Sequence, residues 1–314
     1  MKHIEREDIQ IINAHSNWSE ANIDQVLKTE IYNDKQAWLK FLKTLFFSLG
    51  VGFTTAGILF FFAYNWADLN KFVKLGLIEV LIIAITLTVV CVTIHLNVKK
   101  ILLTSAVMLV GVLFAVFGQI YQTGANAYDF FLGWSMAVVL WVIISDFAPL
   151  WLIFVILINT TFILYSEQVA HNWSLTFVCT SLFIINLLFL SIALFTPQIK
   201  DTIKVPLWFT HILTLIVVVF ATVGIGSGIF DDYPIEMLIL TIATIAMYTI
   251  AIRQGIKEKN GFYLSVFPFS IIIIITTLLA SVMNDIGMLL VISLFVITSV
   301  TLVIKNLINL HKNG

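Results

Sequence analysis

Apolar residues fill ten long runs of the chain, separated by short polar segments. Each run has about the 20 residues that a helix needs to cross the hydrocarbon core of a bilayer. None alternates apolar and polar positions as the strands of a membrane β-barrel do. The pattern therefore predicts an all-α, polytopic integral membrane bundle of about ten transmembrane helices. The expected spans are 41–64, 72–95, 101–120, 129–145, 149–165, 173–195, 205–230, 235–252, 262–283 and 286–304.

The polar ends of the chain divide it further. Residues 1–37 hold no long apolar run, but Ile23, Val26, Leu27 and Ile31 share one face at helical spacing. We therefore expect a short cytoplasmic amphipathic helical segment over 1–37, a transmembrane helical bundle over 38–310 and a cytoplasmic tail over 311–314.

The composition excludes a soluble enzyme, a nucleic-acid binder, a disulfide-stapled secreted domain and a disordered chain. The chain is 60% hydrophobic and 11% charged, with a mean hydropathy of +1.02, whereas soluble domains are roughly 45–50% apolar and about 25% charged. The chain has 17 Lys and Arg residues and 18 Asp and Glu residues. Its net charge is therefore too small to attract polyanions. We expect contact with the lipid bilayer and no nucleic-acid partner, no cofactor and no metal site.

The basic residues predict the topology. If the N-terminus is cytoplasmic, only Lys71 and Lys74 of the 17 Lys and Arg residues fall on the outward side. Positive residues are retained on the cytoplasmic side during insertion. Both termini are therefore expected in the cytoplasm.

Small residues predict where helices approach one another closely. They recur at helical spacing as Gly52 with Ala56, Gly111 with Gly118, and Gly224 with Gly228. In lipid, helices associate through such close approach because burying apolar surface gains little there.

Polar residues of the first four spans gather near the outer face in this topology. Glu79 lies seven residues into its span, roughly 10 Å below the outer end, where a carboxylate needs a partner, a proton or water. Lys71 lies on the same helix, and Gln119 and Tyr121 come from the next span. The expected site is an outward-facing polar pocket; the alternative is a purely structural hydrogen-bond network. The candidate residues are Asn65, Trp66, Lys71, Glu79, Gln119, Tyr121, Gln122 and Asp129.

Two segments carry a resemblance to a known family. Residues 57–66 have the sequence GILFFFAYNW and residues 118–122 the sequence GQIYQ. Both resemble signatures of a bacterial membrane protein family catalogued as domain of unknown function 2157, and the resemblance extends over residues 1–145. The resemblance implies a protein of the bacterial cytoplasmic (inner) membrane. It implies no particular activity, because none is established for the family.

Three functions fit these observations. The first is binding or transport of a small molecule, an ion or a lipid headgroup through the outward-facing pocket. The second is a scaffold or sensor subunit of an envelope complex, with a membrane-protein partner or a second copy of the chain. The third is an enzyme acting on a lipid-linked substrate, which would need Glu79 and Asp129 as acid and base. No residue is assigned a catalytic role, and a non-enzymatic function is favoured.

Cysteine labelling tests the topology. With Cys91 and Cys179 replaced by alanine, an Ala125→Cys variant should react with an impermeant thiol reagent added outside the cell, whereas Glu258→Cys should not. Labelling of Glu258→Cys alone would reverse the orientation.

Overall fold

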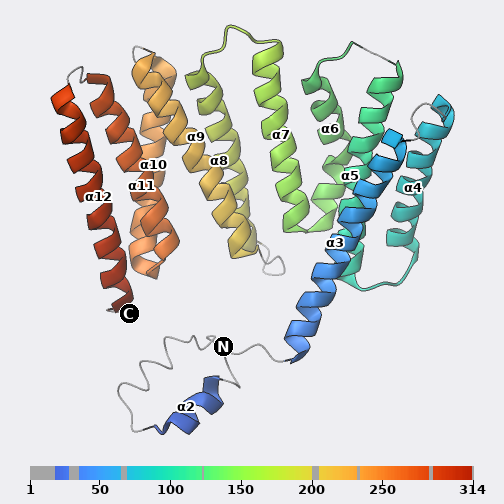
Figure 1. Cartoon of the computed structure of the whole chain (residues 1–314), viewed down its shortest axis with the longest axis horizontal. Helices are drawn as coiled ribbons and strands as arrows, with labels where there is room; N and C mark the ends of the chain where they lie inside the picture. The colour runs from blue at the N-terminus through green and yellow to red at the C-terminus, as the bar shows by residue number, and fades with distance from the viewer. Residues whose placement is uncertain are drawn as a thin grey trace. The chain divides into compact units, whose positions relative to one another are not determined.

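The computed structural model describes residues 18–27, 35–64, 69–121, 124–199, 205–231, 234–282 and 286–312. Within these residues the chain is all-α, with no strand, and ten of its helices are long and apolar enough to cross a membrane (Figure 1). The expected fold class and number of spans are therefore confirmed. The helices are α2 (Glu20–Val26), α3 (Lys35–Tyr64), α4 (Lys71–Cys91), α5 (Leu96–Tyr121), α6 (Ala127–Ser145), α7 (Ala148–Gln168), α8 (Leu175–Ile199), α9 (Leu207–Phe230), α10 (Ile235–Glu258), α11 (Gly261–Val282) and α12 (Ile286–Lys312).

Several helices extend beyond the apolar runs that predicted them. α3 begins at Lys35, α10 continues to Glu258 and α12 continues to Lys312. The added turns contain lysine and arginine, which are good helix formers but do not belong in hydrocarbon. Hydropathy therefore locates the membrane-crossing part of each helix, and the helix itself continues into the polar region. Of the expected N-terminal segment, α2 is described, whereas Ile31 lies outside the described residues.

The chain divides at Leu109, within α5, into two compact units, each described by itself. The first unit contains α2, α3, α4 and the first part of α5. Asn70 caps α4 in an extended backbone conformation, and its side-chain oxygen accepts a hydrogen bond from the backbone N–H of Val73 at 2.9 Å. This cap satisfies one of the amide groups that a helix start leaves free.

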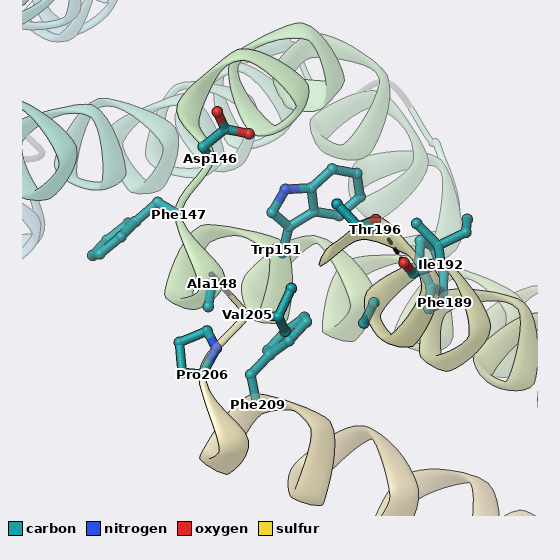
Figure 2. A pocket seen from close by; sticks show the side chains of 11 residues that line it. Asp146, Phe147, Ala148, Trp151, Phe189, Ile192, Thr196, Val205, Pro206 and Phe209 are labelled. Atoms are coloured by element: carbon teal, nitrogen blue, oxygen red, sulfur yellow. Dashed lines mark hydrogen bonds between the residues drawn. The ribbon is translucent and has the colours of Figure 1, made fainter. Parts of the chain in front are cut away.

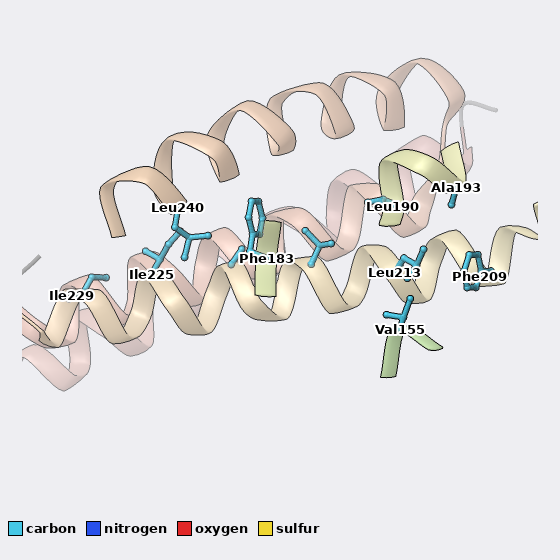
Figure 3. Close-up of a cluster of buried hydrophobic side chains, with 11 residues drawn as sticks. Val155, Phe183, Leu190, Ala193, Phe209, Leu213, Ile225, Ile229 and Leu240 are labelled. Carbon is cyan, nitrogen blue, oxygen red and sulfur yellow. The ribbon is translucent and has the colours of Figure 1, made fainter. Parts of the chain in front are cut away.

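The second unit is organised around α9, which contacts α7, α8, α10 and α11. Its buried apolar residues recur every fourth position, so they form one ridge along the helix. Phe183 of α8, Leu240 of α10 and Val155 of α7 pack against this ridge (Figure 3). The ridge consists of Phe209, Leu213, Val217, Ala221, Ile225 and Ile229.

Glycines let α9 approach its neighbours closely. A Cβ atom at Gly224 would lie 2.6 Å from Leu240 Cδ2 and 2.7 Å from Cys179 Cβ, and one at Gly228 would lie 2.6 Å from Met237 Cβ. Gly111 likewise leaves room for the Trp134 ring, which a Cβ would meet at 2.6 Å. These three expected contact points are confirmed.

The same expectation finds no support at two other glycines. A Cβ at Gly52 or Gly118 would meet no described atom within 4 Å. Their spacing along the sequence matches that of the confirmed positions. Helical spacing therefore identifies a smooth helix face, but it does not say whether another helix lies against that face.

A pair of buried asparagines joins α7 to α8. Asn159 Nδ2 donates to Asn186 Oδ1 at 2.9 Å, and Asn186 Nδ2 donates to Asn159 Oδ1 at 2.6 Å. Each Nδ2 also donates to a carbonyl of its own helix, that of Val155 at 2.9 Å and that of Leu182 at 2.8 Å. Both N–H groups of each amide are thus satisfied, as a membrane interior requires.

Alanine substitution tests the close approach at Gly224. Gly224→Ala should lower the stability of the protein by about 1–2 kcal/mol, because overpacking against Cys179 and Leu240 outweighs the gain in helix propensity. Gly118→Ala is the matched control and should be neutral or stabilising by up to about 1 kcal/mol. Thermal unfolding of the purified protein in detergent measures both, and equal stability of the two variants would contradict the packing argument.

Candidate functional site

The residues of the expected outward-facing pocket fall into three groups. Lys71 and Glu79 lie on α4 in the first unit, whereas Gln119, Tyr121 and Asp129 lie on α5 and α6 in the second. Asn65, Trp66 and Gln122 lie outside the described residues. The two units are described separately and three of the eight residues lie outside the described residues, so the pocket stays a prediction.

On α4 the buried charge is a lysine rather than the expected glutamate. Glu79 is exposed, while Lys74 is only 7% exposed and shares a buried face with Ile78. Glu79 follows Ile78 directly, so it lies about 100° around the helix from that face. Lys71 lies eight residues before Glu79, roughly 12 Å along the axis, and its ammonium group lies 5.3 Å from the centre of the Phe72 ring.

On α6 the candidate acid has a structural contact. Asp129 Oδ2 accepts a hydrogen bond from the backbone N–H of Asn126 at 3.0 Å, which is the acidic half of a capping box. One residue earlier, the backbone N–H of Tyr128 donates to Gln168 Oε1 of α7 at 3.1 Å. Asp129 therefore stabilises the start of α6, and the Tyr128 backbone ties that start to α7.

A first cavity lies at the turn between α6 and α7, and Figure 2 shows it from close by. Its volume is about 230 Å³, and most of its lining is apolar and aromatic, including Trp151, Phe189 and Phe209. The charged residue in the lining is Asp146, the C-cap of α6, which has a left-handed backbone with φ 44°. An aspartate tolerates that conformation better than most residues. One carboxylate beside aromatic rings does not by itself define a chemistry.

A second, larger cavity lies between α9, α10 and α11, and we call it the hydroxyl cavity. Its volume is about 520 Å³, within the range of small-molecule sites. Isoleucines form most of its wall, and Thr241, Thr244, Tyr248 and Thr249 supply hydroxyl groups along one face of α10. Apolar walls with a few hydroxyls suit an apolar ligand that carries an oxygen atom.

A chain of hydrogen bonds supports the tyrosine of this cavity. Tyr248 Oη lies 2.7 Å from Ser270 Oγ of α11, which lies 2.6 Å from Thr222 Oγ1 of α9. Thr222 donates its own proton to the backbone carbonyl of Val218 at 2.7 Å. Because each hydroxyl has one proton, Ser270 must donate to Thr222, and Tyr248 must donate to Ser270. The hydroxyl proton of Tyr248 is thus donated to Ser270, and the Tyr248 oxygen can accept a hydrogen bond from the cavity side.

Two threonines of the cavity lack the hydrogen bond that several other threonines of the apolar helices make. Thr222, Thr249 and Thr276 each donate to the carbonyl four residues earlier, the usual partner of a threonine in a helix. The hydroxyls of Thr241 and Thr244 are buried and have no hydrogen-bond partner among the described residues. Buried hydroxyls without partners are uncommon. Both oxygens have almost no accessible surface, so a ligand in the cavity would reach them after the side chain rotates.

Sequence reasoning missed this site because it gave charged residues the most weight. The signal was present: Thr241, Thr244 and Tyr248 recur at helical spacing in an otherwise apolar span. The partners Thr222 and Ser270 lie on other helices, and nothing in the local sequence pairs them with Tyr248. For metals, no cluster of three His, Cys, Asp or Glu side chains occurs in the part of the chain that the structure describes.

The fold defines a polytopic helical membrane protein, and the comparisons with known proteins agree. Residues 19–151, less than half of the 314 residues, match the family described as Predicted membrane protein (DUF2157), a domain of unknown function. No curated protein and no solved structure matches the chain. The match extends from α2 to the start of α7 and therefore ends before the hydroxyl cavity.

The direction of the hydrogen-bond chain can be tested by stability measurements. Ser270→Ala leaves the Tyr248 proton without an acceptor and should destabilise the protein by about 1–3 kcal/mol. Tyr248→Phe removes that donor, and the loss of the hydrogen bond should lower the stability by a smaller amount, about 0.5–1.5 kcal/mol. Ser265→Ala is the control, because Ser265 bonds only to the Phe262 carbonyl of its own helix. Equilibrium unfolding in mixed micelles measures all three, and a Tyr248→Phe loss larger than that of Ser270→Ala would reverse the assigned direction.

Proposed function

We propose that this membrane protein binds a small, largely apolar ligand that carries a hydrogen-bonding oxygen, in the hydroxyl cavity between α9, α10 and α11. The observation that carries the proposal is a pair of buried hydroxyls, those of Thr241 and Thr244, which find no partner in the described part of the chain and belong to residues that line a cavity of about 520 Å³. A carbonyl or hydroxyl oxygen of the ligand would supply the missing partner. The isoleucine wall would hold its apolar body.

The depth of these hydroxyls strengthens the argument. Thr244 lies nine residues from the start of α10 and fourteen from its end, roughly 14 and 21 Å along the axis. This places it near the middle of the membrane, where bulk water cannot serve as a partner. A hydroxyl left unpaired there lowers the stability by about 1–3 kcal/mol. A ligand that pairs with it gains a corresponding part of that free energy in binding.

Access from the bilayer is also available. Ile245 and Thr249 line the cavity and are exposed. In a membrane these side chains would face lipid, so an apolar molecule could enter sideways from the bilayer. Binding of a ligand dissolved in the membrane requires no water-filled channel.

A matched pair of threonine variants tests the proposal. Native mass spectrometry of the purified full-length protein should detect a retained small molecule, which Thr244→Val should lose by at least five-fold. Thr249→Val should retain it, because that hydroxyl lines the same cavity but already donates to the Ile245 carbonyl at 2.7 Å. Thr244→Val should not be less stable than wild type without ligand, since it removes an unpaired buried hydroxyl. Equal retention by both variants would refute the proposal.

The outward-facing pocket around Glu79 is the second candidate for ligand binding. Glu79 is exposed on α4, and a carboxylate suits a polar ligand or an ion. Glu79→Gln belongs in the same experiment: loss of the retained molecule in this variant, with retention in Thr244→Val, would assign binding to the outward-facing pocket.

The scaffold or sensor function is favoured by a different feature. In the apolar stretches Phe41–Ile58 of α3 and Leu289–Asn309 of α12, none of the side chains that the structure describes is buried. Such helices can pack against another membrane protein or a second copy of the chain. The enzyme hypothesis receives less support, because the Asp129 carboxylate is engaged in capping α6.

For location we propose the bacterial inner membrane with both termini in the cytoplasm. The distribution of lysine and arginine supports the orientation, and the resemblance to a bacterial family supports the membrane. The cysteine labelling described above tests the orientation.

A further inference from the structure

A third cavity lies between α10, α11 and α12, and its lining changes character from one end to the other. Its volume is about 470 Å³, and it meets the hydroxyl cavity at Ile252, which lines both. Pro268 and Val303 accompany Ile252 at the apolar end. Lys259, Asn306 and Asn309 line the polar end. We call it the interfacial cavity, because the polar end coincides with the ends of α10 and α12.

The positions along the helices give this gradient a direction. Lys259 lies seven residues beyond Ile252 on α10, roughly 10 Å along the axis. On α12, Asn309 lies six residues beyond Val303 in the same sense. The apolar part therefore lies deeper in the bundle, and the polar part lies where the helices leave the hydrocarbon.

The charge around the polar end is positive. Four basic residues lie there: Arg253 and Lys257 on the last turns of α10, Lys259 at its C-cap, and Lys305 near the end of α12. Glu258 is the acid among the described residues there. The Glu258 carboxylate already accepts a hydrogen bond from Gln254 Nε2 at 2.9 Å. An anion at this end would therefore meet net positive charge.

The backbone at Lys259 is a second, independent observation. Its φ of 53° lies in the left-handed region, at the C-cap of α10 where glycine is the usual residue. A lysine is strained there, and a strained residue that lines a cavity points to a function for its side chain. The side-chain oxygen of the neighbouring Asn260 accepts hydrogen bonds from the backbone N–H groups of Phe262 and Tyr263.

We propose that the interfacial cavity is a binding site for an anionic phospholipid. Its phosphate would lie at Lys259, with the amides of Asn306 and Asn309 as further donors, and an acyl chain would descend past Ile252. Basic pockets between membrane helices are known to hold anionic lipid headgroups, and the apolar depth distinguishes a lipid from a soluble phosphate. This site is separate from the ligand of the hydroxyl cavity.

A lipid competition experiment tests the proposal. The full-length protein is placed in nanodiscs of phosphatidylcholine and phosphatidylglycerol, three to one, with identical acyl chains, and the lipids retained after mild extraction are counted by native mass spectrometry. Wild type should be enriched in phosphatidylglycerol. Lys259→Gln should lower that enrichment about five-fold, the equivalent of about 1 kcal/mol per lysine at a membrane surface.

Three further variants separate a site from general attraction. Lys257→Gln removes the same charge from the same turn outside the cavity lining and should stay within about two-fold of wild type. Lys259→Gly should raise the unfolding midpoint in pure phosphatidylcholine, by relieving the backbone, yet lose the enrichment. Thr244→Val should keep it, so failure of this proposal is distinct from failure at the hydroxyl cavity.

Three results would overturn the proposal. In the first, wild type retains the two lipids in the bulk three-to-one ratio. In the second, Lys257→Gln and Lys259→Gln lose the phosphatidylglycerol enrichment equally. In the third, Lys259→Gly keeps the full phosphatidylglycerol enrichment.

Discussion

Every polar group that a helix carries into a bilayer has to find its hydrogen-bond partner within the protein. In this chain the requirement is met locally wherever possible. Thr86, Thr161 and Thr214 each donate to the carbonyl four residues earlier, and Asn159 and Asn186 complete each other. Within the described residues, the buried hydroxyls that have no partner are those of Thr241 and Thr244, and both residues line the cavity between α9, α10 and α11.

The second unit places different chemistry at different depths. At mid-membrane, hydroxyl groups and a directed chain from Tyr248 to Val218 face an isoleucine wall. At the ends of α10 and α12, lysine and asparagine face a cavity with an apolar floor. The two cavities share Ile252, so a ligand in one would share a wall with a ligand in the other. Occupation of either could then influence the other through this side chain.

The sequence predicted what depends on length and composition. Ten spans follow from ten apolar runs, because a bilayer sets both the length and the polarity of a crossing helix. Contacts between helices depend on rotation about the helix axis, which a single sequence does not determine. Gly224 and Gly118 therefore had the same prediction and different outcomes, and Tyr248 could not be paired with Ser270 in advance. Glu79 received weight as a charge, whereas the neighbouring Lys74 is the one that is buried.

The asparagine pair also bears on motion within the second unit. Each amide is held by its own helix through Val155 or Leu182 as well as by its partner, so neither side chain can turn to follow a displacement. Sliding α7 past α8 by one turn, about 5.4 Å, would break both interhelical bonds at once and strand four polar groups in hydrocarbon. A small change of tilt about the pair would preserve them. The asparagine pair therefore opposes sliding between α7 and α8 and permits a pivot about Asn159 and Asn186.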